Sequence, residues 1–173
     1  MITKPTEGDF APYYAQYIAL VPETKNILSE LHQQHMDTID LLTSLDDNTL
    51  QSSYAPGKWT IMEIVMHLMD CERIFAYRAL RFARKDKTDL PGFDHDVYVK
   101  NSQAHSKKIL NLVKELSLLR ASTIELFNSF DEEMLAQTGT ANSNIVKVSA
   151  LAYIICGHEI HHRNVIEALY IGK

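Results

Sequence analysis

The chain of 173 residues lacks most of the features that mark specialised classes of protein. Its only cysteines are Cys71 and Cys156, too few for the disulfide framework of a small secreted domain. No segment approaches the roughly 20 apolar residues of a transmembrane helix, and Met1 to Asp9 carry no apolar run of a secretory signal. These absences predict a reduced, cytoplasmic protein with no membrane partner.

An excess of basic residues is missing as well. Lys and Arg number 17 against 22 Asp and Glu, which gives a net charge of −5. Proteins that bind nucleic acids need a basic face for the phosphates, so we expect no nucleic-acid partner. The densest basic run, Arg78 to Lys85, is followed by Asp86 and Asp89. We interpret it as the charged end of a long helix, where cations are favoured.

Glycine and proline are scarce, with 6 and 5 residues, and helix signals dominate. Apolar residues recur at helical spacing over about 21–45, 60–85, 101–130 and 145–170. Thr60 and Glu63 match a capping box at the start of the second segment. The pattern predicts an all-α four-helix bundle formed by a single domain over residues 1–173. The longest non-helical insert, residues 89–100, provides one longer crossover, either as a pocket wall or as a plain connection.

The most informative motif lies near the C-terminus, at His158-Glu159-Ile160-His161-His162. His158 and His162 are one helical turn apart, within the apolar stripe of the fourth predicted helix. An unpaired polar group in a core costs about 1–3 kcal/mol, so both rings need partners. A divalent metal ion would satisfy both rings at once, and imidazole suits zinc, nickel, copper and iron. The alternative is a plain bundle whose histidines bind water.

Two histidines form only half of a metal site, and the third ligand must come from upstream. His67 is the best candidate, because it lies on the shoulder of the apolar stripe of the second helix, where a side chain enters the groove between packed helices. Four further histidines remain alternatives: His32, His35, His95 and His105. His161 is a candidate for a substrate contact or for a group that supports the ligands, and equally for a surface residue.

Two further residues are weak catalytic candidates. Cys71 lies one turn after His67 on the same side of the helix, so its thiol could approach the metal, although a small buried side chain is the simpler interpretation. Glu159 could act as a base, since His158-Glu159-x-x-His162 matches the H-E-x-x-H pattern of metallopeptidases. That function is a minor alternative, because such enzymes take a third ligand downstream and no His or Cys follows His162. We expect Glu159 at the solvated edge of the stripe.

Several longer motifs resemble those of the DinB-like superfamily. Pro56-Gly57-Lys58-Trp59-Thr60, continued by Glu63-Ile64-x-x-His67-Leu68, resembles its second-helix signature. Gly157-His158-Glu159-Ile160-His161-His162 resembles its fourth-helix signature, and the similarity extends over about residues 22–170. The resemblance implies a four-helix bundle whose metal ligands, by matching positions, are His67, His158 and His162. It also implies zinc or nickel as the ion, and a homodimer.

The superfamily includes thiol transferases that use bacillithiol, mycothiol-dependent isomerases and proteins described as metal-dependent hydrolases. The resemblance therefore implies a metal-dependent enzyme that acts on a small molecule, through thiol S-transfer or hydrolysis at an open three-histidine site. A low-molecular-weight thiol is the expected partner in the first case. The alternative is a non-catalytic metal-binding or dimerisation module, in which the ion clamps two helices together.

Overall fold

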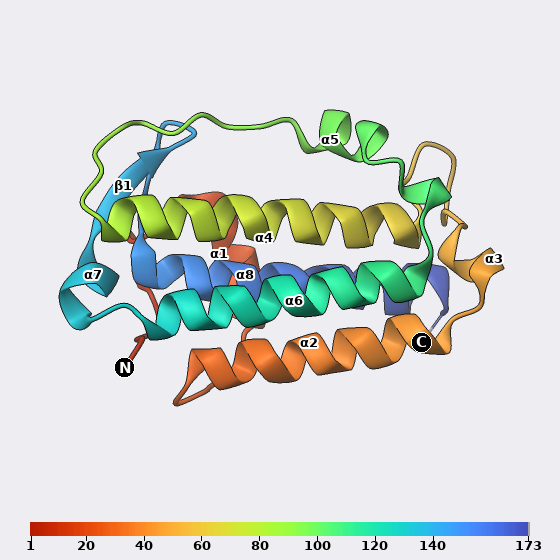
Figure 1. Cartoon of the computed structure of the whole chain (residues 1–173), viewed down its shortest axis with the longest axis horizontal. Helices are drawn as coiled ribbons and strands as arrows, with labels where there is room; N and C mark the ends of the chain where they lie inside the picture. The colour runs from red at the N-terminus through yellow and green to blue at the C-terminus, as the bar shows by residue number, and fades with distance from the viewer. Residues whose placement is uncertain (173) are drawn as a thin grey trace.

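The computed structural model describes residues 1–172, and four long helices make up most of it (Figure 1). They are α2 (Ile27–Ser44), α4 (Ile61–Ala83), α6 (Ile109–Asn128) and α8 (Val148–Val165). Helices α2 and α4 each pack against both α6 and α8, so they occupy diagonal positions in the bundle. The predicted fold class, a four-helix bundle, is confirmed.

Shorter elements join and extend these helices. They are η1 (Pro12–Tyr14), α1 (Ala15–Leu20), α3 (Asp47–Leu50), α5 (His95–Asn101), η2 (Ala104–Ser106), α7 (Glu132–Ala136), β1 (Thr138–Ala141), β2 (Asn144–Lys147) and the π-helical turn η3 (Ile166–Tyr170). The crossover from α4 to α6 runs back along α4 and carries α5 (Figure 1). Within residues 1–172, no helix combines the length and the apolar character needed to cross a bilayer.

The capping box at Thr60 is present as predicted and explains where α4 begins. Oγ1 of Thr60 accepts a hydrogen bond from the amide of Glu63, whose carboxylate accepts one from the amide of Thr60. The predicted start of the first long helix near Val21 is wrong. Helix α2 begins at Ile27, because the side chain of Asn26 accepts hydrogen bonds from the first free amides of the helix.

Three other boundaries also differ from the sequence prediction. The third long helix is predicted from about residue 101, but α6 begins at Ile109, after the short elements α5 and η2. The insert 89–100 is not wholly irregular, because Asp94 caps the short helix α5. The last long helix begins at Val148, since residues 144–147 form β2, which pairs with β1 in an antiparallel hairpin. Asn142 and Ser143 form its turn with positive φ angles of 51° and 60°. Asparagine tolerates this conformation better than most residues.

The N-terminal helix α1 packs closely on α8 at Gly157. A Cβ atom at this position would lie 2.0 Å from the carbonyl oxygen of Tyr17, so only glycine fits without moving the backbone of α1. This close approach places the ring of Tyr17 edge-on to His158, with ring centroids 5.3 Å apart. Helix α1 therefore borders the histidine motif of α8.

Candidate metal centre

Three histidines from α4 and α8 converge inside the bundle. Nε2 of His158 lies 3.1 Å from Nε2 of His67 and 3.2 Å from Nε2 of His162. The ring centroids of His67 and His162 are 4.9 Å apart. Since α4 and α8 pack side by side, the i, i+4 pair on α8 faces a single ring on α4. The three residues selected from the sequence therefore lie together in the structure.

Hydrogen bonding among the three rings cannot satisfy all three nitrogens. Nε2 of His158 carries either one lone pair or one hydrogen, so it completes a good hydrogen bond with only one of its two neighbours. Two nitrogens bound to one ion at about 2.0–2.1 Å are about 2.9 Å apart at a right angle and about 3.3 Å apart at a tetrahedral angle. The observed 3.1 and 3.2 Å lie between these values. These two spacings thus fit a divalent metal ion. Within residues 1–172, the group of possible ligands whose atoms all lie within 4.8 Å of one another is His67, Cys71 and His158, and His162 joins it through His158.

The protonation state of the three rings also suits a metal ion. Burial lowers the pKa of His67 to about 4 and that of His162 to about 3. Burial, together with the nearby rings of His162 and His67, holds the pKa of His158 well below its usual range. All three imidazoles are therefore neutral at pH 7, and their lone pairs are available to a cation.

Cys71 lies beside this cluster, as the sequence spacing suggested. Its Sγ is 3.6 Å from both Nδ1 and Nε2 of His67, and it lies within 4.8 Å of a ring nitrogen of His158. Burial raises the pKa of the thiol to about 12. The side chain is therefore a protonated thiol at neutral pH, which would have to lose its proton before it could bind a metal.

The other candidate histidines lie outside the cluster. His35 is buried between α2 and α6, where its Nε2 is 2.9 Å from Oγ of Ser117. His32 and His105 lie on the surface. His95, at the start of α5, is exposed but approaches the site, with its ring centroid 5.7 Å from that of His67. The ring of His161 packs against the ring of Tyr17, with ring centroids 5.2 Å apart.

The expectation that Glu159 is solvated is wrong. Its side chain is 2% exposed, and Oε2 accepts a hydrogen bond from Arg120 of α6 at 2.7 Å. Arg120 also makes a bidentate pair with Glu72 of α4, at 3.0 and 2.9 Å. The buried charge of Arg120 is thus held by two carboxylates, and its NH1 also reaches the carbonyl oxygen of Leu31.

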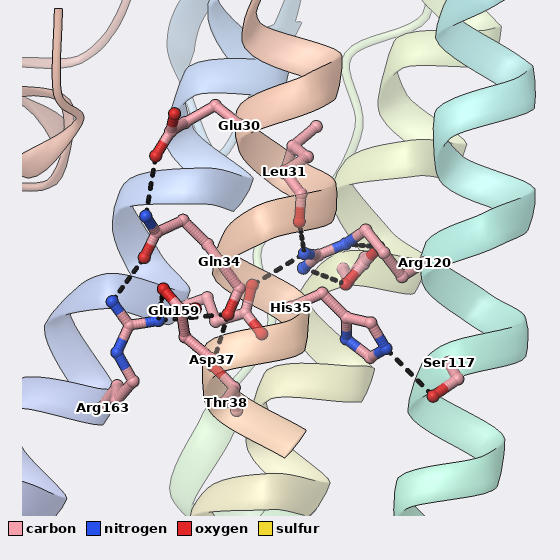
Figure 2. A network of polar contacts seen from close by, with 11 residues as sticks. Glu30, Leu31, Gln34, His35, Asp37, Thr38, Ser117, Arg120, Glu159 and Arg163 are labelled. Carbon is pink, nitrogen blue, oxygen red and sulfur yellow. Dashed lines mark hydrogen bonds and ion pairs between the residues drawn. The ribbon is translucent and has the colours of Figure 1, made fainter. Parts of the chain in front are cut away.

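Figure 2 shows how this network extends across the bundle. Arg163, one turn after Glu159 on α8, donates to the backbone and side-chain oxygens of Gln34. Gln34 in turn donates to Glu30 at 2.7 Å. The network fixes α8 against α2 and α6 and so orients the helix that carries His158. Sequence reasoning missed it, although Arg120 follows Leu112 and Leu116 at core-facing spacing on α6.

A pocket of about 330 Å³ opens onto the histidine cluster. Its walls are mainly aromatic, and they come from the N-terminal segment, from the turn before α4 and from the insert 89–100. Phe93 and His95 show that this insert is a pocket wall. Arg78 also lines the pocket and is only 4% exposed. The prediction that Arg78 belongs to a charged helix end is therefore wrong for this residue.

Comparisons with known proteins agree with these features. A family model described as the DinB superfamily matches residues 30–166. A protein of Oceanobacillus iheyensis, named as a candidate metal-dependent hydrolase, is 25% identical over 125 residues, which cover 71% of each chain. YfiT from Bacillus subtilis, described as a candidate metal-dependent hydrolase with an unusual four-helix bundle topology, superposes with a TM-score of 0.70. That match has 16% identity and covers 96% of this chain and 91% of YfiT.

Proposed function

The chain belongs to the DinB superfamily, and we propose that it is a metal-dependent enzyme that acts on a small molecule. The observation that carries the proposal is the close approach of Nε2 of His158 to Nε2 of both His67 and His162, beside an aromatic pocket. We propose His67, His158 and His162 as the ligands of a divalent ion, zinc or nickel. The relatives named as metal-dependent hydrolases support a metal, and imidazole nitrogens suit both ions.

A divalent ion on three neutral ligands keeps its full charge, so it lowers the pKa of a water molecule or thiol that binds it. The protein's own contribution is positional. The Arg120 network orients α8, and the pocket walls limit the access of water to the cluster. The pocket volume of about 330 Å³ is within the range of small-molecule sites.

The pocket lining bears on the type of reaction. The described residues that line it include no Asp or Glu. Hydrolysis needs a base beside the attacking water, and Glu159 does not meet that need because its carboxylate pairs with Arg120. A thiol has an ordinary pKa of about 8.5, far below the value of about 15.7 for water, so it would lose its proton on an ion with less help from a base. A pocket without a carboxylate base therefore favours thiol S-transfer. Hydrolysis, which the names of the relatives favour, would rely on His95 or His161 of the pocket wall.

A non-catalytic metal site is the second candidate, and one observation favours it. Sγ of Cys71 lies 3.6 Å from Nε2 of His67, close enough to complete a closed four-ligand site. The raised pKa of this thiol argues for an open site instead, because the metal would have to displace its proton. The same geometry gives no support to a metallopeptidase, since Glu159 faces Arg120.

Metal analysis of purified protein tests the proposal. We expect about one zinc or nickel ion per chain in the wild type, and loss of that metal in His67→Ala, His158→Ala and His162→Ala. His161→Ala is the matched control, because its ring packs on Tyr17, and it should keep the metal. Equal metal content in all five proteins would remove the metal from the function.

An activity panel then separates the two reaction types. The wild type is offered a generic aryl halide with several low-molecular-weight thiols, and in parallel a series of small esters and amides. We expect thiol conjugation that stops when a chelator removes the metal and returns when the metal is restored. Turnover that the chelator leaves unchanged, or turnover of esters alone, would refute the thiol-transfer version.

A further inference from the structure

Arg78 is a buried cation without an acidic partner. Arg78 is 4% exposed. Within residues 1–172, it forms no ion pair with an acidic side chain. Its one hydrogen bond runs from NH2 to the carbonyl oxygen of Pro91, at 3.0 Å. A charge removed from water in this way is costly unless an opposite charge compensates it. Arg120 illustrates the usual solution, with two carboxylates around one guanidinium.

Arg78 is one of the residues that line the pocket leading to the histidines. It is the only Lys or Arg among the described lining residues. Residues 67, 71, 75 and 78 follow one another along one face of α4, so Arg78 and His67 lie at opposite ends of the same wall. Phe75 lies between these ends, with its ring 6.0 Å from Cζ of Arg78 and 6.3 Å from the ring of His158.

The charge of Arg78 acts on other groups in this part of the protein. Burial raises the pKa of Cys71 to about 12, and the positive charge of Arg78 opposes that rise. Burial also raises the pKa of Tyr14 above its ordinary value, again with Arg78 acting in the opposite direction. The guanidinium therefore presents an uncompensated positive potential to a largely aromatic cavity.

We propose that this pocket binds a small molecule through a carboxylate that pairs with Arg78, while the aromatic walls hold an apolar part and the reacting group points to the histidines. This inference rests on the proposed function only where it says that the other end of the bound molecule reacts at the histidines. A single guanidinium, with NH2 already engaged by Pro91, matches the single charge of a carboxylate better than the double charge of a phosphate. The bound carboxylate would supply the counter-charge that Arg78 lacks.

Binding of simple probes tests this assignment. Trp59 is the single tryptophan of the chain and lines the pocket, so its fluorescence reports occupancy. Phenylacetate, 3-phenylpropanoate and 4-phenylbutanoate are compared with their amides and with phenylphosphonate. We expect the best carboxylate to bind about tenfold or more tightly than its amide, as for a charge-assisted hydrogen bond. Phenylphosphonate should bind less tightly than the best carboxylate.

Substitutions at Arg78 distinguish pairing with a carboxylate from a purely structural role. Arg78→Met should bring the ratio of carboxylate to amide affinity close to one, with amide affinity and metal content unchanged, and Arg78→Lys should restore part of the ratio. Arg84→Met, at the exposed end of α4, is the matched control and should keep the full ratio. A structural role of Arg78 would weaken both ligands together and leave the ratio as it was.

The metal provides a second check, because a carboxylate could also bind an ion directly. His158→Ala should keep the preference for carboxylates even where it loses the metal, so failure of the metal proposal leaves this test intact. A preference that disappears with His158→Ala and survives Arg78→Met would overturn the assignment. A wild type that binds amides or phenylphosphonate as well as carboxylates, or that binds none of the probes at millimolar concentrations, would overturn it as well.

Discussion

His158 and Glu159 are neighbours in α8, yet their side chains belong to two different clusters. Nε2 of His158 lies 3.1 Å from Nε2 of His67, whereas Oε2 of Glu159 accepts a hydrogen bond from Arg120 at 2.7 Å. The turn of the helix between adjacent residues points one side chain at the pocket and the other at the interior of the bundle. The candidate metal centre and the buried ion network are therefore joined directly through the backbone of α8, between residues 158 and 159.

Removing the charge of Arg120 should strongly destabilise the protein. Arg120→Met leaves Glu72 and Glu159 buried without their partner, and loss of one member of a buried ionic network costs about 3–5 kcal/mol. Urea unfolding of metal-free protein measures the change. Arg73→Met removes solvent-accessible pairs with Asp70 and Glu115 and should cost less than about 1 kcal/mol. Equal losses of stability in the two variants would contradict the conclusion that the buried ion pairs contribute more than the exposed ones.

Glu159→Gln should leave metal content unchanged. The carboxylate faces Arg120 and not the histidines, so the amide replaces a charged hydrogen bond without touching the proposed ligands. We expect a lower free energy of unfolding and about one metal ion per chain. Urea unfolding and elemental analysis of the same preparation measure the two quantities. Loss of the metal together with normal stability would place Glu159 in the metal centre instead.

Cys71→Ala should retain the metal if the site is open. The thiol is protonated at neutral pH because burial raises its pKa to about 12, and the same holds for Cys156. Both thiols of the folded, metal-free protein should react slowly with a thiol reagent at pH 7.5 and rapidly after unfolding. Cys156→Ala serves as the control. If Cys71→Ala alone abolished metal binding, a closed, structural site would be the better description.

The stability of the metal-free protein should fall as the pH drops from about 6.5 to about 4. Burial lowers the pKa of His35 and of His67 to about 4, while both titrate near 6.5 in the unfolded chain. Between these values the unfolded state binds more protons than the folded state, so acid favours unfolding. Each such histidine adds up to about 1.4 kcal/mol per pH unit. His35→Gln should therefore reduce the slope measured by urea unfolding at pH 7, 6, 5 and 4.5, and an unchanged slope would contradict this.

Metal loading should change the fluorescence of Trp59. Its ring centroid is 4.8 Å from that of His67, and it is the only tryptophan in the chain. Titration of metal-free protein with nickel should quench the emission with a stoichiometry of about one ion per chain. His162→Ala should abolish the saturable response. A response that persists in this variant would indicate nickel bound elsewhere.

The fold was largely predictable because four apolar stripes with helical spacing leave few other architectures. The ends of the individual helices were less predictable. The helix expected from Val21 begins only at Ile27, since the strong cap of Asn26 overrides the weaker signal of Pro22. The β1–β2 hairpin was missed because its turn uses Asn142 and Ser143 in place of glycine. Tertiary pairing, which a single sequence does not display, decides such segments.

The histidine cluster could be anticipated because imidazoles at i and i+4 on an apolar stripe need partners. The groups that surround it could not. The sequence pattern suggests a solvated helix end for Arg78 and gives no role to Arg120, because a charged side chain is usually solvated. Their positions on core-facing stripes of α4 and α6 were the available signal. The homodimer and the identity of the metal stay predictions, which light scattering and elemental analysis can measure.

The glycine at position 157 determines how substitutions can reshape the pocket of this protein. It sets the distance between α1 and α8, and α1 carries Tyr17 of the pocket but none of the three histidines. A larger residue there would displace the N-terminal wall and leave the imidazoles on their own helices. The shape of the pocket can thus be altered through a single contact between two helix backbones, independently of the three histidines.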